Sequence, residues 1–238
     1  MTTNHAKAPP NSTADTKPNT SDLIGMAGLS ALLAGICYVL VGVFHPPNVS
    51  SSVTSTRWEV VHILACAMCF FGLLGMAGLY ARQAKKIGRL GLSGFVVFSL
   101  WLVLIMGFSF VEAAILPRIA TSDPRFVDGW FGMLTGSATT VHLGALSTLW
   151  TLTAPIYMVG GLLFGVATFR ARILPRWAGA LLAAGTVLAP VAGLLPNASQ
   201  PKMAVPVGLA LAWLGYALWS ERRAETSELE SRQRATSR

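Results

Sequence analysis

The sequence predicts an all-α fold, an integral membrane bundle of six transmembrane helices with both termini in the cytoplasm. The 238 residues are 53% hydrophobic and 12% charged, and their mean hydropathy is +0.57. A soluble domain of this length and composition has too few polar residues to cover its surface. The chain also contains six apolar stretches near the length that crosses a bilayer, about 20 residues. These observations predict a multi-pass protein of the cell (cytoplasmic) membrane, with the lipid bilayer as its partner.

The six predicted spans fill almost the whole chain between its two tails. They cover residues 23–44, 58–80, 90–116, 142–169, 177–195 and 203–219. Because little sequence remains between them, we expect residues 22–220 to form a single six-helix transmembrane domain. Residues 1–21 are rich in Thr, Asn, Pro and Ala and predict a disordered cytoplasmic tail. Residues 221–238 mix Glu with Arg and predict a charged cytoplasmic tail.

The placement of the basic residues supports this topology. A net charge of +8 would suggest nucleic acid as the partner of a soluble protein. Here the basic residues gather in alternate connections, which is the positive-inside pattern of membrane proteins. The pattern predicts no nucleic-acid partner and places both termini and two short basic turns in the cytoplasm. The cytoplasmic set is Arg82, Lys85, Lys86, Arg89, Arg170, Arg172, Arg176, Arg222, Arg223, Arg232, Arg234 and Arg238, against Arg57, Arg118, Arg125 and Lys202 on the other side.

The longest predicted connection lies on the outer side, over residues 117–141. Loops of this length often cover or bind something. Within it, Asp123-Pro124 and Asp128-Gly129 predict turns. Two tryptophans near the outer span ends, Trp58 and Trp130, are interpreted as members of the aromatic belt of a membrane protein.

Three prolines fall within predicted spans four, five and six. Each removes an intrahelical hydrogen bond, which predicts kinks at these positions. The three are Pro155, Pro190 and Pro206.

Four ionisable side chains converge on the predicted outer side of the membrane. Glu112 is the only carboxylate well inside an apolar stretch, and His45, His62 and His142 lie near the ends of neighbouring stretches. At 1.5 Å rise per residue, all four fall within ~10 Å of the outer hydrocarbon boundary. Ionisable groups at membrane depth are costly and mark functional sites. We therefore predict a ligand or proton site formed by Glu112, His62, His142 and His45.

The chemistry of this cluster stays open at the sequence level. Three imidazoles and one carboxylate suit Zn²⁺, Fe or Cu, and two of the histidines suit a b-type haem. A proton or substrate pathway is a second interpretation, because burial raises a carboxyl pKa and histidine titrates near neutral pH. The third is structural: Glu112 pairs with His62 or Arg118 and ties the helices together. No close-spaced motif such as HExxH selects among them.

The function therefore has several candidates. The leading hypothesis is a membrane protein of undefined role with a polar ligand, metal or proton site near its outer face. The alternatives are a proton-coupled carrier of a small or lipophilic solute, a membrane-embedded metal- or haem-dependent enzyme, and an interaction subunit of a larger membrane complex.

Four short motifs resemble a known group of proteins. They are Phe44-His45-Pro46, Trp58-Glu-Val-Val-His62, Gly88-Arg-Leu-Gly91 and Arg172-Ile-Leu-Pro175-Arg-Trp177-Ala-Gly179. They resemble small multi-pass membrane proteins of bacteria, especially actinobacteria, grouped as a domain of unknown function. The resemblance covers most of residues 23–219. It implies a six-helix integral membrane protein and supplies no activity, substrate or catalytic residue.

Overall fold

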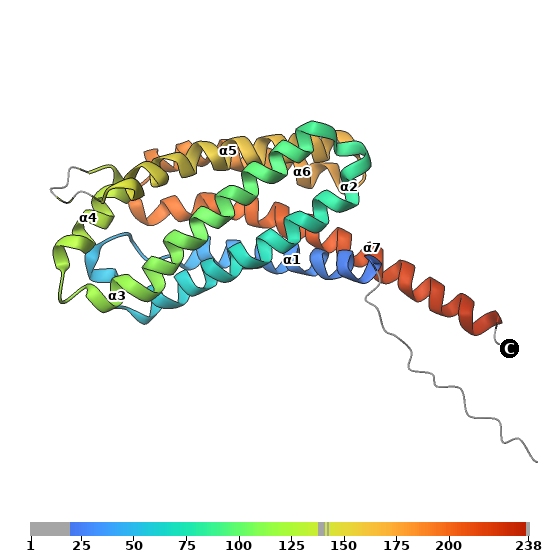
Figure 1. The fold of residues 1–238 in the computed structure, drawn as a ribbon, viewed down its shortest axis with the longest axis horizontal. Coiled ribbons are helices and arrows are strands. Elements are labelled where there is room, and N and C mark those ends of the chain that lie inside the picture. The colour runs from blue at the N-terminus through green and yellow to red at the C-terminus, as the bar shows by residue number, and fades with distance from the viewer. Residues whose placement is uncertain (1–19, 138–140, 142, 237–238) are drawn as a thin grey trace, which may run out of the picture.

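The predicted all-α class is confirmed by a computed structural model, which describes residues 20–137, 141 and 143–236 (Figure 1). In this part of the chain every regular element is helical. Short 3-10 helices η1, η3 and η4 and one π-helical segment, η2 (Val111–Ile115), join the α-helices. The α-helices are α1 (Thr20–Phe44), α2 (Thr56–Phe110), α3 (Leu116–Ile119), α4 (Pro124–Thr135), α5 (Ala145–Ala171), α6 (Arg176–Val187) and α7 (Val205–Thr236).

Within the described residues, four helical stretches are long and apolar enough to cross a membrane. They are Leu23–Phe44, Thr56–Ile119, Ala145–Ala171 and Ser199–Ala224. The second has 64 residues, which in a straight helix would measure about 95 Å against a hydrocarbon thickness of about 30 Å. The chain is thus built as a multi-pass membrane protein.

The long helix α2 is a hairpin rather than a rod. Gly88 has φ 61° and ψ −162°, a conformation that glycine adopts without steric cost, and the chain reverses there (Figure 1). Residues 56–87 form a first arm and residues 89–110 a second arm, which runs back beside it. The turn falls in the basic connection predicted between the second and third spans.

The predicted fifth span is only partly α-helical. Helix α6 ends at Val187, and the 3-10 helix η3 (Ala189–Leu194) follows it. Twelve residues are fewer than the ~20 that an α-helix needs to cross a bilayer. Pro190, predicted to kink a continuous helix, instead lies in this 3-10 segment, because a proline cannot continue the backbone hydrogen bonds of α6.

The other two prolines differ from each other. Pro155 lies inside α5 as predicted. Pro206 is the second residue of α7, which begins at Val205 after the 3-10 helix η4 (Asn197–Ala204). A missing N–H costs little in the first turn of a helix, so the prediction of a kink within a span at Pro206 is wrong.

The outer connection also folds into a helix. Asp123 caps α4 by accepting a hydrogen bond from the backbone N–H of Phe126 at 3.1 Å, and Pro124 is the first helical residue. Asp128 and Gly129 then lie inside α4, so the predicted turn at this pair is wrong. The Ser50 hydroxyl of η1 (Ser50–Ser52) donates to the Asp128 carboxylate at 2.7 Å and ties α4 to the α1–α2 connection.

The helices close into a ring. α1 packs against α7 and α2, the second arm of α2 packs against α5, and α6 packs between α5 and α7 (Figure 1). Small residues allow these close approaches. A Cβ added at Gly35 of α1 would meet the backbone nitrogen of Ala212 in α7 at 2.3 Å.

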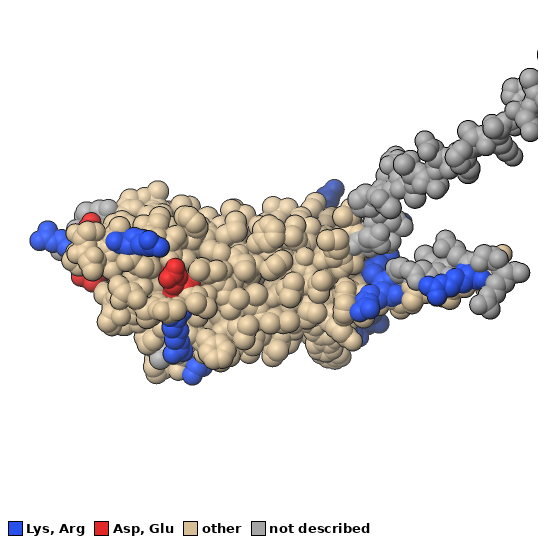
Figure 2. All heavy atoms as spheres, turned by 90° about the horizontal axis from the view of Figure 1, so that it is seen from below, with Lys and Arg blue, Asp and Glu red and all other residues tan. Residues whose placement is uncertain are grey.

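Charged residues lie at the two ends of the bundle. On the face shown in Figure 2, the middle has no charged side chain, and the end that carries α1's start and α7's end shows only Lys and Arg among its charges. An ion pair between Arg82 and Glu221 joins α2 to α7 at that end. The helix α7 continues past residue 219 to Thr236. Residues 1–19 of the predicted N-terminal tail lie outside the described residues.

The α1–α7 contact predicts different effects for the same substitution at two glycines of α1. Gly35→Ala forces the backbones apart and lowers the free energy of unfolding by about 1–3 kcal/mol. At Gly25 an added Cβ meets only the Cβ of Arg222 at 3.5 Å and its Cγ at 4.0 Å, which are ordinary contacts. Gly25→Ala therefore leaves stability unchanged or raises it by up to about 1 kcal/mol through helix propensity. Thermal unfolding in detergent compares the two, and equal midpoints would contradict this packing.

Candidate functional site

The second arm of α2 ends in a π-helical turn, which is wider than an α-helical turn, just before Pro117. The backbone N–H of Leu116 bonds to the carbonyl of Val111, five residues back, instead of to that of Glu112, four residues back. The next N–H in this pattern would come from residue 117 and would bond to the Glu112 carbonyl. Pro117 has no N–H, and its ring crowds the carbonyl four residues back. The π-helical turn η2 thus leaves the Glu112 carbonyl without a helical partner.

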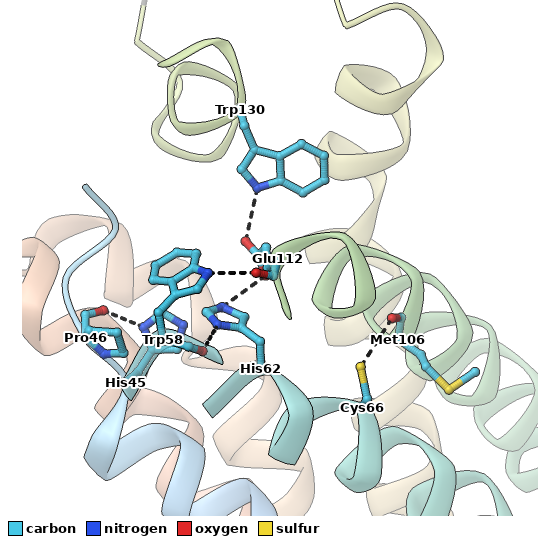
Figure 3. A network of polar contacts seen from close by, with 8 residues as sticks. All are labelled: His45, Pro46, Trp58, His62, Cys66, Met106, Glu112 and Trp130. Atoms are coloured by element: carbon cyan, nitrogen blue, oxygen red, sulfur yellow. Dashed lines mark hydrogen bonds and ion pairs between the residues drawn. The ribbon is translucent and has the colours of Figure 1, made fainter. Parts of the chain in front are cut away.

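Trp58 supplies the missing donor. Its indole Nε1 donates to the Glu112 carbonyl oxygen at 2.8 Å (Figure 3). Trp58 is fully buried, and a buried carbonyl without a partner costs several kcal/mol in an apolar environment. The first turn of α2 is thereby fixed to the end of its second arm. Trp58 is therefore a structural hydrogen-bond donor, and its interpretation as a belt residue is wrong.

His62 lies one turn further along α2 and faces the Glu112 carboxylate. Its Nδ1 is 2.7 Å from the Trp58 carbonyl oxygen, which only accepts, so Nδ1 carries a proton. Its Nε2 is 3.2 Å from Glu112 Oε2. A bare ring nitrogen and a carboxylate oxygen repel each other at this distance, so one of them also carries a proton. In either arrangement the pair has no net charge.

The Nε2 atom of His62 keeps an unused hydrogen-bonding capacity. The approach of Glu112 Oε2 has the distance of an ion pair but not the geometry of a hydrogen bond, and Nε2 has no hydrogen-bond partner among the described residues. His62 is only 2% exposed. Buried polar atoms are almost always bonded, so such an atom needs an explanation.

Helix α4 covers the carboxylate from the other side. Trp130 Nε1 donates to Glu112 Oε1 at 3.2 Å, so the two carboxylate oxygens have different partners (Figure 3). Trp130 is fully buried, and the belt interpretation is wrong for it as well. Around these contacts lies an apolar cluster made of Val53, Trp58, Phe108, Leu116, Val127, Trp130 and Phe131. The predicted outer loop is therefore a cap whose core residues reach the site.

His45 is the second histidine of the site. It follows α1 directly, outside the predicted span, and its ring centroid is 5.0 Å from that of His62. Burial, and after it the neighbouring His62, lower the pKa of His45. The ring is thus neutral at neutral pH. Its Nδ1 is 2.6 Å from the Pro46 carbonyl oxygen and carries the proton, which leaves Nε2 as an acceptor.

These side chains line a cavity of 190 Å³ inside the bundle. His45, His62 and Glu112 line the end of it nearest α4. Tyr38 lies two turns of α1 below His45, about 10 Å deeper, and Trp101 lines the cavity near that depth. Most of the remaining wall is apolar. The Tyr38 hydroxyl donates to that of Tyr157 at 3.1 Å.

The structure brings together three of the four predicted site residues. Glu112, His62 and His45 share one cavity, whereas His142 lies outside the described residues. Among the described residues, no group of three or more His, Cys, Asp or Glu side chains has an arrangement that holds a metal ion. Glu112 pairs with His62 as one interpretation expected, and Arg118 is exposed.

Other residues of the site were not predicted. Trp130 and Trp101 take part through packing between helices that are distant in the sequence. One signal was present for the cap: Asp123-Pro124 before an apolar segment is a helix start.

Comparisons with protein-family models, curated proteins and solved structures give no match for this chain. The resemblance of its short motifs to bacterial membrane proteins therefore stays a prediction.

The role of Pro117 predicts a coupling between two distant substitutions. Trp58→Phe leaves the Glu112 carbonyl unpaired and lowers the free energy of unfolding by about 1–3 kcal/mol. Pro117→Ala restores an N–H that can bond to this carbonyl. In the Pro117→Ala background, Trp58→Phe should therefore cost less, with a coupling energy of about 1 kcal/mol. Unfolding of the four proteins by SDS in mixed micelles measures it.

The control for this cycle is Tyr38→Phe. It also removes a buried aromatic donor, but from the Tyr157 contact deeper in the bundle. Its effect should add to that of Pro117→Ala without coupling. If the effects of Trp58→Phe and Pro117→Ala also add without coupling, the Glu112 carbonyl does not depend on the Trp58 indole.

Proposed function

We propose that this chain is an integral membrane protein that binds a small, mostly apolar molecule through a neutral hydroxyl group within its helical bundle. The observation that carries the proposal is the buried Nε2 of His62, which lacks a hydrogen-bond partner, on a side chain that lines a mostly apolar cavity. Concave apolar sites with a few polar groups are typical of small-molecule binding. Binding is the first step of both a carrier and an enzyme.

The charge of the site supports a neutral head group. The His62–Glu112 pair has no net charge, so an ion brought into the cavity would stay uncompensated at a large desolvation cost. A hydroxyl both donates and accepts. It can therefore bond to His62 Nε2 or Glu112 Oε2 in either protonation state of the pair, and the acceptor Nε2 of His45 suits it as well.

The cavity volume sets the size of the ligand. An apolar cavity of about 150 Å³ holds benzene, and this cavity has 190 Å³. The part of the ligand inside it therefore has roughly eight non-hydrogen atoms. The aromatic walls formed by Trp101, Phe108 and Trp150 favour a planar ring.

The proposal also includes the number of membrane crossings and the side of the membrane on which the termini lie. We infer six crossings, with α6 and η3 together forming the fifth and both termini in the cytoplasm of a bacterium. Support comes from the basic residues at the end of the bundle that carries the start of α1 and the end of α7 (Figure 2). The bacterial cytoplasmic membrane itself rests on the motif resemblance.

The binding proposal is tested with 4-ethylphenol, a hydroxyl-bearing ring of the required size. We expect saturable binding of the tritiated compound to protein in phosphatidylcholine nanodiscs, measured by scintillation proximity. His62→Phe and Glu112→Gln should weaken it about tenfold or more, since a hydrogen bond to a charged or polar buried pair contributes about 1.5–3 kcal/mol.

Glu59→Gln is the matched control for this measurement. Glu59 is exposed in the first turn of α2, at the same end of the bundle as the site, and does not line the cavity. Its substitution should leave binding unchanged. The proposal fails if 4-ethylphenol does not saturate the protein, or if all three variants bind it as the unaltered protein does.

The topology is tested by single cysteines in a background where Cys37, Cys66 and Cys69 are alanine. We expect Thr54→Cys, beside η1, to react with a membrane-impermeant maleimide in intact cells. Lys85→Cys, near the Gly88 turn, should react only after permeabilisation. Labelling of both positions in intact cells would contradict the assignment.

A further inference from the structure

A second hollow lies beside the cavity, on the outside of the bundle. It is an apolar groove of 250 Å³ between the second arm of α2 and the first turns of α5. Its lining includes Val103, Gly107 and Val111 on α2 and Leu146 and Leu149 on α5. Val103 and Leu149 are exposed. Both stretches belong to helices apolar enough to span the membrane, so a bilayer crossed by these helices would place hydrocarbon against the groove.

The groove and the cavity share a wall one side chain thick. Phe108 lines both hollows and is 5% exposed. Consecutive residues line them in turn: Val111 lines the groove and Glu112 the cavity, and Leu149 lines the groove and Trp150 the cavity. Trp130, which donates to Glu112, also lines the groove. The two spaces therefore run side by side over the same depth of the bundle.

The wall is made of contacts that a side-chain rotation can open. Phe108 packs by its ring against Trp150, with centroids 5.2 Å apart, and against Trp130, with centroids 5.7 Å apart. Aromatic pairs of this kind are held by weak, non-polar forces. No hydrogen bond or ion pair holds Phe108, which has only an apolar side chain.

We propose that the groove binds the hydrocarbon chain of the ligand whose hydroxyl head lies at His62 and Glu112. The ligand is then a single-chain membrane amphiphile that enters sideways from the bilayer past Phe108. This inference rests on the proposed function and extends it by naming the class of ligand and its route. A hydrocarbon chain is the occupant because the groove is apolar, opens to lipid and adjoins the cavity at the level of the polar pair.

Gly107 offers a way to fill the groove without disturbing the cavity. A Cβ added there meets no atom within 4 Å, and Gly107 lines the groove but not the cavity. Gly107→Leu should therefore fold normally. The matched control is Gly193→Leu, also at a position with open space around an added Cβ, in η3 away from the groove.

The experiment compares a short and a long probe, tritiated 4-ethylphenol and 4-dodecylphenol, on protein in phosphatidylcholine nanodiscs. Both probes should bind the unaltered protein. Gly107→Leu should weaken the binding of 4-dodecylphenol about tenfold or more, because the leucine side chain fills the groove that holds the dodecyl chain. It should change the affinity for 4-ethylphenol less than about twofold. Gly193→Leu should change neither.

A photoreactive 4-dodecylphenol with a diazirine on its chain locates the bound tail directly. Crosslinks are expected on the groove residues of α2 and α5, at positions such as Val103 and Leu149. Crosslinks confined to other surfaces, or undiminished 4-dodecylphenol binding by Gly107→Leu, would overturn the inference. Saturable binding of 4-ethylphenol without binding of 4-dodecylphenol would also overturn it while leaving the proposed function intact, whereas failure of both probes would remove the two together.

Discussion

Pro117 removes one backbone donor at a place where water is scarce, and the surrounding structure is arranged around that loss. The Glu112 carbonyl has no helical partner and takes the indole N–H of Trp58 instead. Trp58 in turn offers its own carbonyl to His62 Nδ1. This second contact fixes the tautomer of His62 and turns Nε2 toward Glu112. One missing N–H thus orients the polar pair, through two hydrogen bonds in series.

The position of the capping helix α4 also depends on the π-helical turn η2 before Pro117. Trp130 reaches Glu112 Oε1 only because the widened turn η2 presents the carboxylate between His62 and α4. A carboxyl group in an apolar bundle needs partners on each oxygen to lower its desolvation cost. Trp130 donates a hydrogen bond to Oε1, and His62 Nε2 lies at ion-pair distance from Oε2. The polar side of the site is therefore held by polar contacts from two helices, while Phe108 on its apolar side has only apolar contacts, among them those with the rings of Trp130 and Trp150.

The sequence predicted the helical class, the basic turn near Gly88 and the meeting of Glu112 with His62 and His45, since these follow from hydropathy, charge and helix rise. It did not predict that Trp58 and Trp130 would be buried donors. Interfacial and buried tryptophans have the same sequence signature at a span end. Nor did it predict that α6 would end at Val187, because hydropathy does not distinguish an α-helix from the 3-10 segment that continues it.

The contrast between the two sides of the site favours one route for the proposed ligand. Toward the bundle's outer end, the polar pair is covered by α4, which is fixed by its Asp123 cap, by the Ser50–Asp128 hydrogen bond and by the buried Trp130. Opening this side would break several polar contacts at once. Toward the groove, Phe108 lines both hollows and packs against Trp130 and Trp150 through apolar contacts. Rotation of one apolar side chain in hydrocarbon exposes no polar group, so the sideways route has the lower cost.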